Sequence, residues 1–335
     1  MIEEINANNL VNSELFVKEP VNEFYKKINN TESSKIILTG GRGTGKSVIL
    51  MNKEKNDISR EDKSIYMHFD PCSRFGSENC RYDERFVIHY YELLFSNKLL
   101  HHIKDNYILT YNKYFKEKHV EVKNKIMEMD AYINNIFSDD AFKNHLALGD
   151  FSYDIIEKLK EVLEVNKLTL MLDRFDSIDG SSEISQKILS NYFRMFDKTI
   201  LSTNDIALMK DNRSNITLDD TYQFIDVDYG TNPDVVKEIL SKRIIKHNEN
   251  VDLAREGIFP LEIITDEMYE YLANNCNGDI KVMIDRARDL IREFWFYGEE
   301  RFSLGLLERY CQAKKSYYDD IYRSLNKPSL YLVKK

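Results

Sequence analysis

The most constraining feature of the sequence is a glycine-rich turn at residues 40–47, which separates two apolar runs. Within it, Gly40, Gly45, Lys46 and Ser47 match the pattern G-x-x-x-x-G-K-[ST]. Glycine tolerates the left-handed backbone that turns successive N–H groups toward one anion, and a helix N-terminus adds a favourable dipole. We therefore expect a phosphate-binding loop between a strand and a helix.

The whole loop is the predicted nucleotide site, made of Gly40, Gly41, Arg42, Gly43, Thr44, Gly45, Lys46 and Ser47. We expect Lys46 to reach the β- and γ-phosphates of ATP as a point charge, and the Ser47 hydroxyl to ligate Mg²⁺. The alternative is a flexible turn without a ligand. That alternative leaves the lysine and serine unexplained, so ATP and Mg²⁺ are the predicted cofactors.

Size and charge narrow the classes of protein to consider. A chain of 335 residues allows two domains, or one large domain with a subdomain. The net charge of −9 argues against a protein that coats nucleic acid, although a local basic face is compatible with it. No apolar run approaches the roughly 20 residues that span a bilayer, and the acidic start lacks signal-peptide features. We expect a cytoplasmic protein with no membrane partner.

The four cysteines show no C-x-x-C spacing, which favours reduced thiols: Cys72, Cys80, Cys276 and Cys311. An alternative is a metal site formed by Cys72, Cys80 and His68. Three ligands at loose spacing fall short of a closed tetrahedral set, so we favour thiols without a metal.

A second candidate site residue follows the apolar run 168–172. We expect that run to be a buried strand, with Asp173 at its tip. A carboxylate there needs a cationic or hydrogen-bonding partner, because burying it alone is costly. Magnesium held beside Ser47 would be that partner, so Ser47 and Asp173 form the predicted metal set. The alternative is an Asp that only closes the strand as an N-cap.

Further strands are expected at residues 36–38, 64–69, 199–203 and 222–227, alternating with helices. Asn204 follows the strand 199–203, at the sheet edge where open α/β sheets bind ligands. Its amide would orient the attacking water or touch the γ-phosphate. A turn-forming Asn-Asp pair is the alternative.

A helical insertion at about 83–150 separates the second and third predicted strands. Its stretch 97–125 is rich in lysine and interleaved with three tyrosines. Such a stripe could bind nucleic acid or an acidic partner. We favour a solvated helix face with the tyrosines packed beneath it. After residue 231 the pattern is helical only, and Lys281 lies off the apolar face of its most periodic helix, at about 280–294.

Taken in order, the phosphate loop, Asp173, Asn204 and the segment Gly278-Asp279-Ile280-Lys281 resemble AAA+ ATPases. The similarity is greatest to the origin-recognition and initiator branch, with some likeness to STAND ATPases. The resemblance implies an α/β P-loop core with a parallel sheet and an all-α lid. The implied domains are an N-terminal lead-in (1–34), the core (35–230), the lid (231–300) and a C-terminal helix and tail (301–335).

The resemblance also implies roles for single residues. Asp173 corresponds to the Walker B acid, Asn204 to sensor 1 and Lys281 to the γ-phosphate sensor of the lid. Arg213 is the first candidate for an arginine finger and Arg194 the second.

Two departures from the family pattern bear on activity. Arg174 stands where the family's water-polarising Glu follows the first acid, and an arginine cannot be a general base. Asp176 could supply an acid three positions after the first, as in STAND proteins. The chain also ends about 40 residues after the sensor-2 helix, without the family's winged helix.

The leading hypothesis is an ATP- and Mg²⁺-binding switch, at most a weak ATPase, that controls assembly or an effector in DNA transactions of mobile elements or defence. Its expected partners are ATP or ADP, further copies of the chain or a separate effector, and DNA only indirectly. One alternative is a DNA-stimulated remodelling or loading ATPase. The other is a non-hydrolysing scaffold stabilised by nucleotide.

Overall fold

The structure, a computed structural model, describes residues 10–11, 13–41, 43–57, 62–68, 84–133, 151–173, 194–202, 222–250, 263–276, 278–297, 303–309 and 311–312. The chain is divided into two compact units. One comprises Lys18–Val227 and contains the sheet, and the other combines Met1–Val17 with Asp228–Lys335. Each unit is described by itself below.

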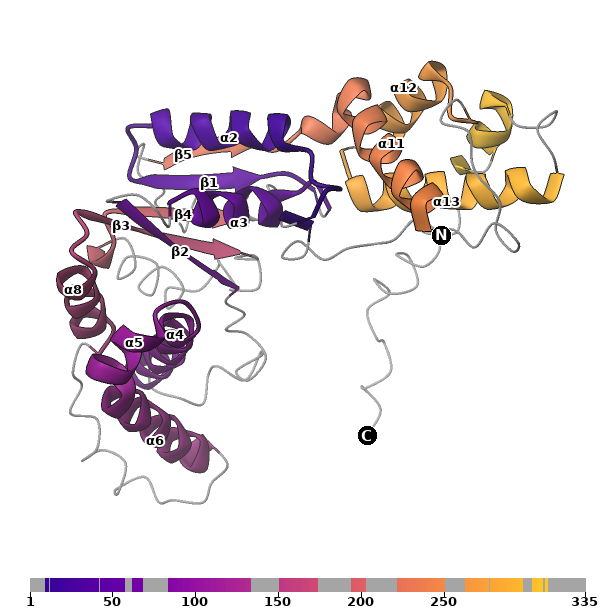
Figure 1. The fold of residues 1–335 in the computed structure, drawn as a ribbon. Coiled ribbons are helices and arrows are strands. Elements are labelled where there is room, and N and C mark those ends of the chain that lie inside the picture. Colours follow the sequence, from indigo (N-terminus) through magenta and orange to yellow (C-terminus); the bar gives the residue numbers. More distant parts are fainter. Residues whose placement is uncertain are drawn as a thin grey trace, which may run out of the picture. The chain divides into compact units, whose positions relative to one another are not determined.

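A parallel five-stranded sheet forms the centre of the first unit (Figure 1). Its strands are β1 (Lys35–Thr39), β2 (Asp62–His68), β3 (Lys167–Asp173), β4 (Lys198–Ser202) and β5 (Tyr222–Asp226), in the order β2-β3-β4-β1-β5. The predicted α/β fold with a parallel sheet is confirmed. The phosphate loop follows β1, and Asp173 is the last residue of β3 rather than the residue after it.

The strands are apolar on both faces because helices cover them. Ile36, Ile37 and Leu38 of β1 are completely buried, as are Leu168, Leu170 and Met171 of β3. Figure 1 shows α2 (Lys18–Asn30) and α3 (Lys46–Asp57) lying along the sheet. α2 begins two residues before Pro20. Proline fits there because N–H groups of the first helical turn have no intrahelical partner.

The insertion is helical over its described part. It consists of α4 (Glu84–Asn106), α5 (Ile108–Thr110), the π-helix η2 (Tyr111–Phe115) and α6 (Lys116–Ile133), and α8 (Phe151–Leu163) follows. The described chain is therefore helical throughout from Ile108 to Ile133, with a π-turn between α5 and α6. A π-turn closes i→i+5 bonds, and here it brings both Tyr111 and Phe115 into the core.

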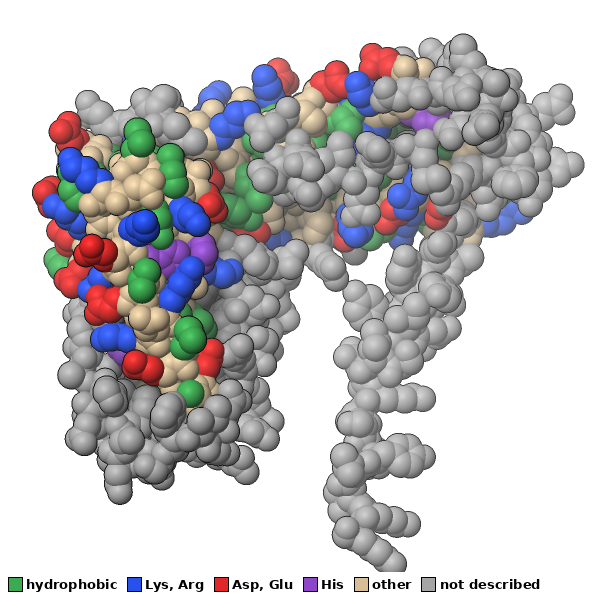
Figure 2. All heavy atoms as spheres, turned by 60° about the horizontal axis from the view of Figure 1, so that its bottom comes forward, with side chains coloured by type: hydrophobic (Ala, Val, Ile, Leu, Met, Phe, Trp, Pro, Cys, Tyr) green, Lys and Arg blue, Asp and Glu red, His purple; other side chains and the backbone are tan. Residues whose placement is uncertain are grey.

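The tyrosines of the lysine-rich stretch 97–125 pack beneath its surface only in part. Tyr111 is buried and contacts His119 through its hydroxyl, at 2.7 Å from Nδ1. Tyr114 is 40 % exposed, with Lys113 and Lys158 over its ring. Figure 2 shows lysines beside histidines on this face. Burial, with a smaller contribution from nearby Lys123 and Lys104, lowers the pKa of His119 to about 4.

The second unit is all-helical in its described residues. It contains the 3₁₀ turn η5 (Tyr229–Thr231), α11 (Pro233–Asn250), α12 (Asp266–Asn275), α13 (Ile280–Tyr297) and a helical segment at 304–309. The Asp279 carboxylate accepts a hydrogen bond from the Val282 N–H at 3.0 Å and so caps α13. This confirms the expected all-α part of the fold.

Two glycines of this unit lie in direct backbone contact. A Cβ added to Gly230 would stand 2.5 Å from the carbonyl oxygen of Gly278, which has a positive φ of 72°. No side chain larger than hydrogen fits between η5 and the turn before α13.

In the part of the chain that the structure describes, no helix is both long enough and apolar enough to cross a membrane.

Candidate functional site

The phosphate loop adopts a conformation that depends on its glycines. Gly40, Gly43 and Gly45 have φ values of 140°, 80° and 95°, in the region that residues with a side chain rarely adopt. At Gly40 an added Cβ would lie 2.9 Å from both Thr44 Oγ1 and the Val227 carbonyl oxygen. The loop is therefore closed against the chain that leaves β5, and Gly40 cannot be replaced without moving it.

Lys46, the first residue of α3, folds back over the loop. Its Nζ donates hydrogen bonds to the carbonyl oxygens of Gly40 and Gly41, both at 2.7 Å, and the side chain is buried. Thr44 Oγ1 donates to the Gly41 oxygen at 3.0 Å. The ammonium group is thus fixed at the loop, where it can act as a point charge for phosphate oxygens.

Ser47 and Asp173 are in direct contact. The Ser47 Oγ donates to Asp173 Oδ2 at 2.6 Å. β1 and β3 are not adjacent, because β4 stands between them. The contact forms because the side chain of Ser47, on α3, reaches the tip of β3.

Two further hydroxyl groups, which sequence reasoning missed, complete the environment of Asp173. Tyr66 of β2 donates from its phenol to Oδ2 at 2.9 Å, and Ser202, the last residue of β4, donates to Oδ1. Asp173 is only 3 % exposed, so these bonds satisfy a buried carboxylate.

The register explains how the two hydroxyls get there. Leu172 pairs with Leu201, so Ser202 follows as the neighbour of Asp173. Met171 pairs with Tyr66, and paired residues of parallel strands share a face. The tyrosine therefore shares a face with Asp173, two residues along, and reaches it diagonally. A strand-end serine was a usable sequence signal for Ser202, whereas Tyr66 had none.

The donor set fits Mg²⁺ with a nucleotide. Hydroxyl and carboxylate oxygens are ligands that this hard cation prefers, and an ammonium group with glycine N–H groups suits phosphates. Elsewhere in the described ranges, no group of three His, Cys, Asp or Glu side chains is placed to hold a metal ion.

Glu54 of α3 connects this helix to β2, the strand that carries Tyr66. Its Oε1 accepts the Tyr66 backbone N–H at 2.9 Å and lies 3.4 Å from His102 Nε2 of α4. Burial raises the pKa of Glu54 to about 7, against the opposing effect of that hydrogen bond. Burial also lowers the pKa of His102 to about 4. Tyr66 is thus held by α3 at its backbone while its phenol reaches Asp173.

The structure does not place the remaining predicted site residues beside Ser47 and Asp173. Arg42, Asp176, Asn204 and Arg213 lie outside the described residues, as do Cys72 and Cys80. Arg194 is exposed at a short helical turn before β4, and Lys281 is the exposed second residue of α13, in the helical unit.

Comparisons with known proteins give distant likenesses only. No protein-family model and no curated protein sequence matches the chain. A Walker-type ATPase of Pyrococcus abyssi has 14 % identity and a TM-score of 0.49, covering 98 % of this chain and 80 % of its own. Domain III of the replication initiation protein DnaA of Thermotoga maritima has 13 % identity and a TM-score of 0.37, covering 88 % and 92 %.

Proposed function

We propose that the chain is an ATP- and Mg²⁺-binding molecular switch of the AAA+ type. One observation carries this proposal: the Ser47 hydroxyl at the start of α3 contacts the Asp173 carboxylate, directly beside a glycine loop that holds Lys46. These are the groups that a magnesium-bound nucleotide requires. Their meeting across an intervening strand is hard to explain as a turn without a ligand.

Each group has a definite task in this proposal. The N–H groups of the glycine loop and Lys46 bind and orient the phosphates, while Ser47 and Asp173 bind the metal ion, directly or through water. Magnesium, when bound, neutralises charge on the phosphate oxygens. Burial of Asp173 excludes bulk water and strengthens its attraction for the cation.

Hydrolysis in this scheme is weak. Arg174 stands beside Asp173, where it cannot take a proton from water. Asp176 and Asn204 are the proposed residues that position the attacking water, and Arg213 or Arg194 is the proposed arginine finger. Lys281 is the proposed sensor of the γ-phosphate. Binding then favours one arrangement of the chain through the differential contacts that ATP and ADP make.

The output we propose is control of self-assembly or of a separate effector in DNA transactions of mobile elements or defence. Support for this setting comes from the motif order that resembles AAA+ initiators. One alternative has its own supporting observation, namely Arg174: a scaffold that nucleotide stabilises without turnover.

A binding and turnover experiment separates these functions. Affinity for a fluorescent ATP analogue is measured with Mg²⁺ and with EDTA, on the wild type, Lys46→Ala and Asp173→Asn. We expect Lys46→Ala to lose binding and Asp173→Asn to lose mainly its magnesium dependence, more than Asp176→Asn does. Unchanged affinity in Lys46→Ala would refute the site.

Phosphate release, followed together with particle size, then tests turnover. The switch predicts slow release that rises in Arg174→Glu, whereas the scaffold predicts background release with ATP-dependent assembly.

A further inference from the structure

Among the residues that the structure describes, the sheet of the first unit ends at β5, and no strand covers the outer edge of β5. The Val227 N–H donates to the Thr39 oxygen of β1 at 2.8 Å, so Val227 faces β1. Backbone groups alternate along a strand, so Gln223 and Ile225 face β1 as well. The N–H and C=O groups of Phe224 consequently point away from the sheet, and in the described residues no strand pairs with them.

Native proteins usually protect such an edge with lysine, proline or a bulge, and β5 has no lysine or proline. Instead it presents Phe224, which is 48 % exposed in the middle of the strand. An unprotected edge with an exposed aromatic residue is a template for another strand.

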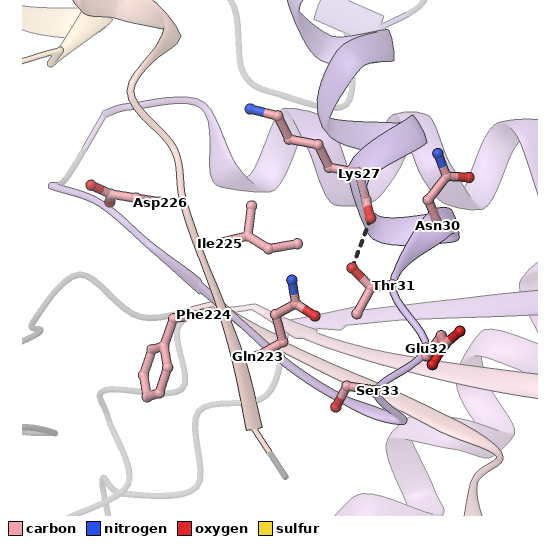
Figure 3. A pocket seen from close by; sticks show the side chains of 9 residues that line it. All are labelled: Lys27, Asn30, Thr31, Glu32, Ser33, Gln223, Phe224, Ile225 and Asp226. Carbon is pink, nitrogen blue, oxygen red and sulfur yellow. Dashed lines mark hydrogen bonds between the residues drawn. The ribbon is translucent and has the colours of Figure 1, made fainter. Parts of the chain in front are cut away.

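A groove of about 700 Å³ runs along this edge, between β5 and the end of α2 (Figure 3). Its lining consists of Lys27, Asn30, Thr31, Glu32, Ser33 and residues 223–226. The groove is mainly polar, with amide groups of Asn30 and Gln223 that suit the backbone or side chains of an added segment.

Three charged side chains line the groove, namely Lys27, Glu32 and Asp226, and Asp226 accepts a hydrogen bond from Thr39 Oγ1 at 3.1 Å. Figure 3 shows Lys27 toward the carboxyl end of β5, while Glu32 lies toward its start. A two-fold rotation about the middle of β5 generates a second copy beside the first. Glu32 of the second copy then lies opposite Lys27 of the first, and Lys27 of the second copy lies opposite Glu32 of the first. The arrangement is self-complementary, as a two-fold interface requires.

We propose that β5 pairs antiparallel with β5 of a second copy about a two-fold axis at Phe224. In this register Phe224 of each copy exchanges both backbone hydrogen bonds with the other, and the two rings become direct cross-strand neighbours. Lys27 of each copy faces Glu32 of the other across the groove. The two sheets become one continuous sheet, which removes both open β5 edges.

The charge pairs give a test with its own control. Sedimentation of the full chain measures the dimer dissociation constant for the wild type, Lys27→Glu, Glu32→Lys and the double variant. We expect each single change to weaken dimerisation by about tenfold, because like charges then oppose each other twice. The double variant restores the wild-type value, since opposite charges face each other again.

A cross-linking measurement fixes the register. In a Cys72→Ser, Cys80→Ser background, Phe224→Cys should form a disulfide-linked dimer on oxidation, because Cα atoms at the axis lie roughly 5.5 Å apart. Gln223→Cys is the matched control, since residue 223 would face residue 225. A wild type that stays monomeric, or a double variant as weak as the singles, overturns the proposal; a monomer would leave the edge to a strand from another protein.

Discussion

Tyr66 donates a hydrogen bond of 2.9 Å to Asp173, joining the edge strand β2 to the tip of β3. The same residue gives its backbone N–H to Glu54 of α3. One tyrosine therefore fixes the carboxylate of the proposed metal site and ties it to the helix that follows the phosphate loop.

Removing this phenol should weaken the proposed metal site. Tyr66→Phe keeps the ring but removes one hydrogen-bond donor from the buried Asp173 carboxylate. Such a hydrogen bond contributes about 1 kcal/mol. We expect the Mg²⁺ concentration for half-maximal ATP-analogue binding to rise about fivefold, the equivalent of that energy.

Tyr25→Phe is the control, because Tyr25 also donates to a carboxylate, Asp57, at 3.1 Å but outside the candidate site. An equal shift in both variants would count against a positioning role for Tyr66.

Gly40 and Gly41 provide a matched pair for the loop. Gly40→Ala places a Cβ 2.9 Å from Thr44 Oγ1 and from the Val227 oxygen, at a φ of 140°. Gly41→Ala meets only Thr44 Cγ2, at 3.8 Å. We expect Gly40→Ala to lose about 1–3 kcal/mol of stability together with nucleotide binding, and Gly41→Ala to stay folded. Urea unfolding and analogue binding measure both, and equal losses would contradict the loop geometry.

The raised pKa of Glu54 predicts that the stability of the fold depends on pH. Its folded pKa, about 7, lies above the ordinary value of 4.5, so the native state binds the proton more tightly than the unfolded state does. The stabilisation is complete below pH 4.5 and is lost as the pH rises through 7. Glu54→Gln mimics the protonated form, so we expect it to be about 1–3 kcal/mol more stable than the wild type at pH 8. At pH 4 the two should be similar.

Urea unfolding at both pH values checks this, with Glu121→Gln as a surface control. A variant that gains equally at pH 4 and pH 8 would show that ionisation of Glu54 is not the cause.

A buried ion pair holds the other end of α3. Lys53 Nζ lies 2.8 Å from Asp57 Oδ2, and both side chains are 5 % exposed. Ser64 Oγ also donates to this carboxylate, at 2.5 Å. Lys53→Met should cost about 3–5 kcal/mol, because Asp57 then stays buried without its cation. Adding Asp57→Asn should recover part of that loss in urea unfolding, and a purely additive double variant would exclude coupling.

Much of the fold was readable from local pattern. Apolar runs without alternation predicted parallel strands covered on both faces, and β3 and β4 lie within one residue of their expected bounds. The end of α3 at Asp57 is not set by such a pattern. Its last turn is held by the Lys53 and Asp57 network, which depends on contacts with α2 and β2 that the local sequence does not reveal.

Only part of the site could be predicted from the sequence, because the remaining residues reach it through the order of the strands. Ser47 and Asp173 follow from residue type and position in a strand. Tyr66 depends on β2 lying next to β3 in a particular register, and Ser202 on β4 lying between β3 and β1. Strand order is a global property, so no local pattern encodes it.

The contact between Gly230 and Gly278 has a mechanical consequence. Backbone meets backbone there, and no rotamer can absorb a displacement between η5 and the turn before α13. Within the helical unit, a shift of η5 should therefore move the turn before α13 as well. Two residues with no side chain thus fix the spacing between these two segments of the helical unit.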